Sequence, residues 1–171
     1  MNLSVVWGLV LFLFAEPTTF FLVSGIVITL LGIFVRVWSS GYIQKNESVI
    51  IDGPYSLTRN PLYLGNFFIG LGFSIMSGRL FLAGAFFILF PLIYLPTIFV
   101  EEKMLLNRFG QQYLNYVQRV PRLFPRFKKV ESNERKFSWK LVRDHREYHA
   151  WLAIVSAVFL LTLKMIWVRI P

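Results

Sequence analysis

The sequence contains no cysteine, and this absence excludes disulfide bonds, thiolate nucleophiles and cysteine-ligated metals. Charged residues are scarce, since they make up 16% of the chain against about 25% in an average soluble domain. At 171 residues the chain is long enough for one domain and too short for a soluble catalytic module beside several membrane spans. A water-soluble globular protein is therefore not expected.

Hydrophobic and aromatic residues are abundant instead. They account for 56% and 18% of the chain, with 18 Phe alone, and the mean hydropathy is +0.57. A small soluble core could not bury this many aromatic rings. The composition predicts a polytopic membrane protein with one domain over residues 1–171.

Five apolar runs are predicted to form transmembrane helices and to give an all-α fold: residues 3–15, 20–37, 62–77, 80–100 and 150–168. A full span needs about 20 apolar residues, so the first and third runs are short and are expected to tilt little or to thin the bilayer locally. The first run has no basic flank and no small-residue cleavage site. We therefore expect it to be a retained span and not a signal peptide.

The positive charge is concentrated between the apolar runs. The chain carries 18 Lys and Arg against 9 Asp and Glu, and residues 101–149 alone carry twelve against six. Because basic loops of membrane proteins lie on the cytoplasmic side, the loops 39–60 and 101–149 are expected to form a cytoplasmic cap. The N terminus would then lie inside and the C terminus outside, in a bacterial inner membrane or the endoplasmic reticulum. The basic cap would face anionic lipid headgroups, and no nucleic-acid partner is expected.

The most informative motif is the segment GPYSLTRNPLYLG, which begins at Gly53 and leads into the third apolar run. Its Gly and Pro favour turns, and Pro61 suits the first turn of a helix, where a missing N–H costs nothing. Arg59 stands at the mouth of the span. Taken alone, it could simply extend to lipid phosphates.

A pair of acidic residues, Glu101 and Glu102, stands at the end of the fourth apolar run. Adjacent carboxylates repel each other, and a cationic ligand would stabilise them. The alternative is that both point into water. The residues that follow supply aromatic rings for stacking, such as Tyr113, and arginines for an anion, such as Arg119 and Arg122.

Gly70-Leu-Gly72 lies inside the third run. It is no dinucleotide fingerprint, because no strand precedes it and Ile75 stands where a third glycine belongs. Small residues in a span favour close helix packing, and the functional alternative is a ligand edge that passes the backbone.

The pair His145 and His149 falls on one helical face, four residues apart. Metal binding needs a third ligand, and the zinc-protease pattern needs Glu directly after the first His, where Arg146 stands. No metal site is predicted. A polar cap to the last span is expected instead.

Together these segments resemble the superfamily of isoprenylcysteine carboxyl methyltransferases and phospholipid methyltransferases, which are integral membrane enzymes. The resemblance covers GPYSLTRNPLYLG, GLG and EEKMLLNRFGQQYLNYVQRVPRLFP, in that order, from Gly53 to Pro125. The family motif Arg-His-Pro-x-Tyr-x-Gly corresponds to residues 59–65, with Asn60 in place of His. Asn exchanges hydrogen bonds but carries no proton at neutral pH, which argues against proton transfer here and leaves cofactor binding unaffected.

The resemblance implies S-adenosylmethionine as cofactor and methyl transfer to a membrane-embedded, lipid-like substrate. The cofactor has cationic groups that suit carboxylates, a carboxylate that suits Arg, and an adenine that suits an aromatic slot. The implied catalytic residues are Arg59, Glu102 and Arg122. The implied cofactor-binding residues are Tyr55, Arg59, Asn60, Pro61, Tyr63, Gly65, Gly70, Gly72, Glu101, Glu102 and Tyr113.

The methyl acceptor is either a carboxylate or an amine. A carboxylate is ionised at neutral pH and needs only a cation to hold it, whereas an amine must first lose a proton to a base. With Asn60 in the place of the motif His and several arginines at hand, carboxyl O-methylation of an isoprenylcysteine-like acid is favoured. The alternatives are phospholipid N-methylation, methylation of another amphiphile, and a membrane scaffold without activity.

Overall fold

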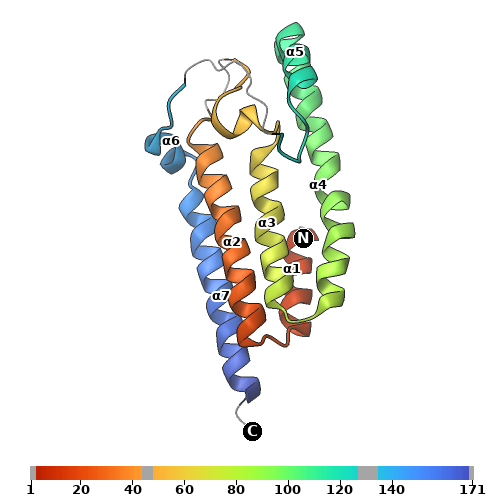
Figure 1. Ribbon diagram of the computed structural model, residues 1–171, viewed down its shortest axis with the longest axis vertical. Helices are drawn as coiled ribbons and strands as arrows, with labels where there is room; N and C mark the ends of the chain where they lie inside the picture. Colours follow the sequence, from red (N-terminus) through yellow and green to blue (C-terminus); the bar gives the residue numbers. More distant parts are fainter. Residues whose placement is uncertain (1–2, 44–47, 127–134, 170–171) are drawn as a thin grey trace.

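The fold is a bundle of helices, shown in Figure 1 for a computed structural model that describes residues 3–43, 48–126 and 135–169. The longer helices run side by side, and the short 3-10 helix η1 lies with α5 and α6 at one end of the bundle. The described residues contain no β-strand. The elements are α1 (Leu3–Phe14), α2 (Thr19–Ser40), η1 (Gly53–Ser56), α3 (Pro61–Met76), α4 (Leu80–Phe109), α5 (Gln111–Arg119), α6 (Trp139–Asp144) and α7 (Glu147–Arg169).

Three of the helices are long and apolar enough to cross a membrane. They are α2 with 22 residues, α4 with 30 residues, and 21 residues of α7 from Glu147 to Trp167. The chain is therefore an integral membrane protein, as predicted. Three of the five predicted spans are thus confirmed as helices of sufficient length. The other two apolar runs form shorter helices, α1 with 12 residues and α3 with 16, so the count of five spans stays a prediction.

Helix α4 extends further than the sequence analysis predicted. We expected the span to end at residue 100 and the loop 101–149 to follow, but the helix continues without a break to Phe109. Glu, Lys, Met and Leu follow the apolar run, and all four are strong helix formers. The helix ends at Gly110, whose φ of 50° is a conformation that glycine adopts without strain. As a result, Glu101 and Glu102 lie on a continuous helix and not in a loop.

Helices α2 and α3 approach each other closely through glycines. Gly25 lies against Gly72, and Gly32 lies against Gly65. A Cβ atom on Gly32 would stand 2.7 Å from the carbonyl oxygen of Gly65, so any side chain here would push the helices apart. Small residues at matching positions are the usual means of close helix packing in membranes. The sequence analysis considered two roles for Gly72, close helix packing and the passage of a ligand edge. Its contacts with α2 agree with close helix packing.

The opposite end of the bundle is closed by two tight joints. The backbone N–H of Glu16, between α1 and α2, donates to the carbonyl of Ser77 at 2.7 Å, and the Glu16 carboxylate pairs with Arg79. Gly78, with φ of 73°, makes the turn between α3 and α4. These contacts fix α1 beside α3 and α4, and the space between them becomes the cavity described below.

Candidate functional site

Two sequence-distant segments meet at the end of the bundle that carries η1 and α5. The backbone N–H of Arg59 donates to the carbonyl of Pro121 at 2.9 Å, and that of Arg126 donates to the carbonyl of Leu57 at 3.0 Å. The Thr58 hydroxyl adds a bond to the carbonyl of Arg122 at 3.0 Å. These bonds bring the motif before α3 against the basic segment after α5.

The carboxylate of Glu102 is the centre of this junction. Only 8% of the residue is exposed, and its oxygens accept hydrogen bonds from Asn60 Nδ2 at 3.0 Å and Arg122 Nε at 3.0 Å. Arg59 Nη1 lies 3.4 Å away. Two guanidinium groups and one amide therefore compensate a single buried negative charge. Such pairing and hydrogen bonding offset the desolvation cost of a buried carboxylate.

Asn60 also donates from Nδ2 to the backbone carbonyl of Arg122 at 3.1 Å, so this one side chain links α4 to the segment after α5. The guanidinium of Arg122 lies over the ring of Phe99 at 4.3 Å. A cation over an aromatic face is attracted by the ring quadrupole, which further fixes its position.

Arg59 retains one unused donor. Its side chain is 9% exposed, and its Nε atom is buried with no hydrogen-bond partner among the described residues. Buried N–H groups are nearly always paired in folded proteins, so this unpaired one is a candidate donor to a ligand atom that accepts a hydrogen bond.

Glu101 differs from its neighbour. Its carboxylate accepts a hydrogen bond from the hydroxyl of Tyr63 at 2.8 Å, and no cation of the described part of the chain lies within ion-pair distance. The ring of Tyr63 contacts the ring of Tyr94 at a centroid distance of 5.6 Å. Of the two adjacent carboxylates, Glu102 is thus neutralised internally and Glu101 is not.

Three tyrosines lie next to this polar cluster, outside the membrane helices. The Tyr116 hydroxyl donates to the backbone carbonyl of Tyr55 at 2.8 Å, and Tyr113 packs against Tyr116 in a small apolar core. Burial, assisted by the charge of Glu102, raises the pKa of Tyr113 to about 12. Burial likewise raises the pKa values of Tyr55 and Tyr116 above their usual range. All three phenols are therefore neutral at physiological pH.

A second charged group, which the sequence analysis missed, lies between α2, α3 and α7. Arg36 donates from Nε and Nη2 to the two carboxylate oxygens of Glu147 at 3.0 and 2.9 Å, and from Nη1 to Asn66 Oδ1 at 2.5 Å. The side chain of Glu147 is 6% exposed. The signal in the sequence was an arginine inside an apolar run, where ionisable residues are rare and paired.

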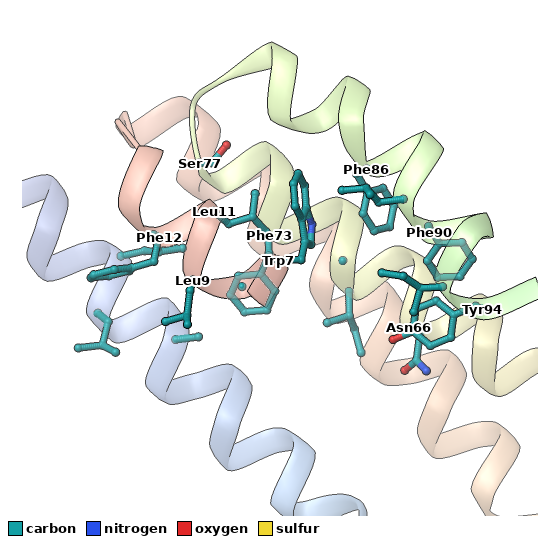
Figure 2. Close-up of a pocket in the computed structure, with 18 residues that line it drawn as sticks. Trp7, Leu9, Leu11, Phe12, Asn66, Phe73, Ser77, Phe86, Phe90 and Tyr94 are labelled. Atoms are coloured by element: carbon teal, nitrogen blue, oxygen red, sulfur yellow. The ribbon is translucent and has the colours of Figure 1, made fainter. Parts of the chain in front are cut away.

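An apolar cavity of about 660 Å³ lies beside the polar cluster and is lined by residues of α1, α3, α4 and α7. Phe73, Phe86, Phe90 and other apolar side chains form most of its wall. Figure 2 shows Asn66 and Tyr94 next to each other at one end of the cavity. Because Tyr94 contacts Tyr63, which holds Glu101, this end of the cavity adjoins the charged cluster.

The structure brings most of the predicted site residues together. The residues gathered around the Glu102 junction are Arg59, Asn60, Pro61, Tyr63, Glu101, Glu102, Tyr113 and Arg122, with Tyr55 behind Tyr116.

The three predicted glycines lie elsewhere on α3. Gly65 and Gly72 face α2, and Gly70 lies on the cavity wall, where a Cβ atom would stand 2.5 Å from the ring of Phe86. Their assignment to the cofactor stays a prediction, and helix packing or the cavity wall accounts for the missing side chain in each case.

The two histidines show no metal-binding arrangement. His145 Nδ1 lies 2.6 Å from the carbonyl oxygen of Leu141, and no group of three metal-ligating side chains occurs among the described residues. In this segment it is Glu147 that forms a buried ion pair, with Arg36.

Comparison with known proteins adds a family to this geometry. The model of the family described as phospholipid methyltransferase matches residues 3–112, which is more than half of the chain. No solved structure matches the chain.

Several curated relatives match part of the chain. The cobalt-zinc-cadmium resistance protein CzcN of Cupriavidus metallidurans is 36% identical over 93 residues, which are 53% of this chain and 43% of that protein. A protein-S-isoprenylcysteine O-methyltransferase of Tribolium castaneum is 33% identical over 77 residues, which are 45% of this chain and 27% of that protein. Protein-S-isoprenylcysteine O-methyltransferase B of Arabidopsis thaliana is 31% identical over 78 residues, which are 46% of this chain and 40% of that protein. The match spans less than half the length of each of these relatives.

Proposed function

This chain belongs to the phospholipid methyltransferase family, and on that premise we propose that it transfers a methyl group from S-adenosylmethionine to the polar end of a lipid-like substrate in the membrane. The observation that carries the proposal is the contact between a charged cluster and an apolar cavity. Tyr63 joins the two, because its hydroxyl binds Glu101 and its ring contacts Tyr94 on the cavity wall. A charged methyl donor and an apolar acceptor need adjacent sites of this kind.

The residues present suit S-adenosylmethionine. Glu101 has no cationic partner in the described chain and suits a positively charged group, while the unpaired Nε of buried Arg59 suits a carboxylate. When bound, this cofactor supplies an activated methyl group on a positively charged sulfur. Glu102 fits a different role than the sequence suggested. Since two arginines and Asn60 already satisfy it, we assign it to hold those three side chains in place.

In such a reaction the protein has to position the two reactants and to exclude water. An in-line displacement requires the acceptor atom, the methyl carbon and the leaving sulfur on one line, and correct positioning supplies much of the rate. The apolar cavity would hold the lipid chain of the acceptor, and its Asn66 and Tyr94 end would place the polar group beside the cluster. Removal of water strengthens the electrostatic interactions there.

For the acceptor we favour a carboxylate, as in the carboxyl O-methylation of an isoprenylcysteine-like acid. The position of the motif histidine is Asn60, whose amide is used in hydrogen bonds to Glu102 and Arg122, so it offers no base. The second candidate is N-methylation of a phospholipid amine, which the family description favours and for which Glu101 is the open carboxylate base.

We further propose that the end of the bundle carrying η1, α5 and α6 faces the cytoplasm. It holds the basic segment around Arg119, Arg122 and Arg126, and positive charge is retained on that side of a membrane. In this orientation the basic surface would face anionic headgroups.

The test of the proposed function is methyl transfer by the purified full chain in nanodiscs. With methyl-labelled S-adenosylmethionine and separate panels of prenyl-cysteine acids and phospholipids, label should enter one lipid fraction. Mild alkali releases an O-methyl ester as methanol and leaves an N-methyl product intact, so product chemistry separates the two candidates. Absence of label from every lipid, with bound cofactor demonstrated by calorimetry, would refute methyl transfer to a lipid. Absence of cofactor binding as well would favour the scaffold alternative.

A further inference from the structure

The Arg36–Glu147 pair fixes the orientation of Asn66. Both carboxylate oxygens of Glu147 engage Arg36, which leaves the guanidinium no freedom to rotate, and Nη1 then points at Asn66 Oδ1 at 2.5 Å. Arginine has donors and no acceptor, so only the carbonyl oxygen of the Asn66 amide can face it. The amide nitrogen must therefore point the other way.

Asn66 also lines the cavity, next to Tyr94 (Figure 2). The described residues provide no acceptor for its amide nitrogen. The two N–H donors of this amide are thus available to an acceptor at this end of a space whose walls are otherwise mostly apolar.

A second donor on the cavity wall has the same need. Trp7 contributes to the wall from α1, and its indole Nε1 is buried without a hydrogen-bond partner in the described part of the chain. By contrast, the hydroxyl of Ser77 is satisfied, because it donates to the carbonyl of Ser74 and accepts from the N–H of Arg79. The unsatisfied nitrogens of the wall are thus donors.

We propose that Asn66 selects the polar end of the lipid that fills this cavity, and that it selects an oxygen acceptor such as a carboxylate over an ammonium. An oxygen acceptor completes the hydrogen bonds of the amide. An ammonium carries only donors, so its hydrogens and those of the amide repel each other. Arg36 acts as a positioning residue through Asn66. The inference rests on the proposed function for its biological meaning, and it names the substrate class of that site.

Gly65 is part of the same device. A Cβ atom there would stand 2.5 Å from Cγ of Arg36. Glycine at this position therefore leaves the space that the arginine side chain needs to reach Asn66. This gives the predicted glycine a role on the substrate side of the site.

The experiment measures lipid binding without cofactor. The full chain in phosphatidylcholine nanodiscs is titrated with tritiated hexadecanoate, hexadecylamine and the neutral ester methyl hexadecanoate at mildly alkaline pH, with empty nanodiscs subtracted. Wild-type protein should prefer hexadecanoate over hexadecylamine by at least about tenfold, and the neutral ester should also exceed the amine. The ester separates hydrogen bonding from charge.

Variants assign the preference to Asn66. Asn66→Leu should abolish the preference, and Asn66→Asp, which can still bind Arg36, should reverse it. Arg36→Lys cannot grip Glu147 with two nitrogens, and it should abolish the preference although no cavity-lining side chain is changed. Asn115→Asp makes the same chemical change on the exposed side of α5 and should leave the preference intact.

The outcomes separate this inference from the proposed function. Equal binding of acid and amine by wild type, or an unchanged preference in Asn66→Asp, overturns the inference even if methyl transfer is found. A preserved acid preference that responds to Asn66 supports the inference even if no lipid is methylated. If Arg36→Lys does not fold, the two Asn66 variants decide.

Discussion

Replacement of Glu102 by Gln removes the one negative charge that two arginines share, at nearly constant volume. Arg59, with 9% of its side chain exposed, then has no counter-charge, and loss of one partner of a buried ion pair costs about 3–5 kcal/mol. The Gln carbonyl still accepts one hydrogen bond, which returns about 1 kcal/mol. Arg122 is 38% exposed and can turn to water, so it adds at most about 1 kcal/mol. We expect Glu102→Gln to lower the free energy of unfolding by about 2–5 kcal/mol.

The matched control is Glu101→Gln, one residue away on the same helix. That change affects a single hydrogen bond from Tyr63, so the expected loss of stability is about 1 kcal/mol. The assay is denaturant unfolding in mild detergent, followed by circular dichroism, with both variants and wild type in parallel. Equal stability of wild type and Glu102→Gln, or a larger loss in Glu101→Gln, would show that Glu102 does not hold the junction together.

Cofactor binding should rank the two variants the other way. A charged hydrogen bond in a partly desolvated site is worth about 1.5–3 kcal/mol, so Glu101→Gln should weaken the affinity for S-adenosylmethionine at least about tenfold by calorimetry. Glu102→Gln should weaken it only through displaced arginines, and measurable binding should remain at temperatures where the variant is folded. Unchanged affinity in both folded variants would refute the cofactor site.

Four further predictions follow from other parts of the molecule. Gly32→Leu should separate α2 from α3 and reduce thermal stability in detergent by far more than Gly84→Leu, whose position has open space around it. The pKa of Tyr113 is raised to about 12, so its contribution to stability is complete below the usual tyrosine pKa near 10 and is lost as pH rises from there toward 12. Phenolate absorbance should lose one phenol that titrates near pH 12 in Tyr113→Phe, while the phenols of Tyr55 and Tyr116 still titrate late. A topology reporter fused after Lys129 should read cytoplasmic and one at Gly78 external, and the reverse pattern would refute the orientation. Gly65→Ala should disturb Arg36 and reduce the preference for lipid acids, whereas Gly84→Ala should not.

Much of the site could be predicted from the sequence because its residues lie in contiguous motifs. Arg59, Asn60 and Tyr63 fall within five positions, and Glu101 and Glu102 are adjacent, so the family resemblance carries them together. The separate roles of the two glutamates could not be predicted. Adjacent residues of a helix point about 100° apart, and only the packing of the 57–61 loop decides which one meets the arginines.

The sequence by itself determined the class of protein, because apolar runs of this length have few alternatives to membrane helices. It also determined where α3 begins, since Pro61 stands at the first position of that helix. The sequence also contained the signal for the end of α4, although we expected the helix to end with the apolar run. A helix stops only where a residue or a contact breaks it, and the charged turn after the apolar run contains no breaker before Gly110.

Only the tertiary structure decided which distant residues share a site. Arg36 and Glu147 are 111 positions apart, and neither local sequence predicts a contact with the other. They meet because α2 and α7 lie side by side, and α2 and α3 approach through glycines until Arg36 reaches Asn66. The cavity has the same origin, since its wall combines side chains of four helices whose separation is set by packing and not by any one segment.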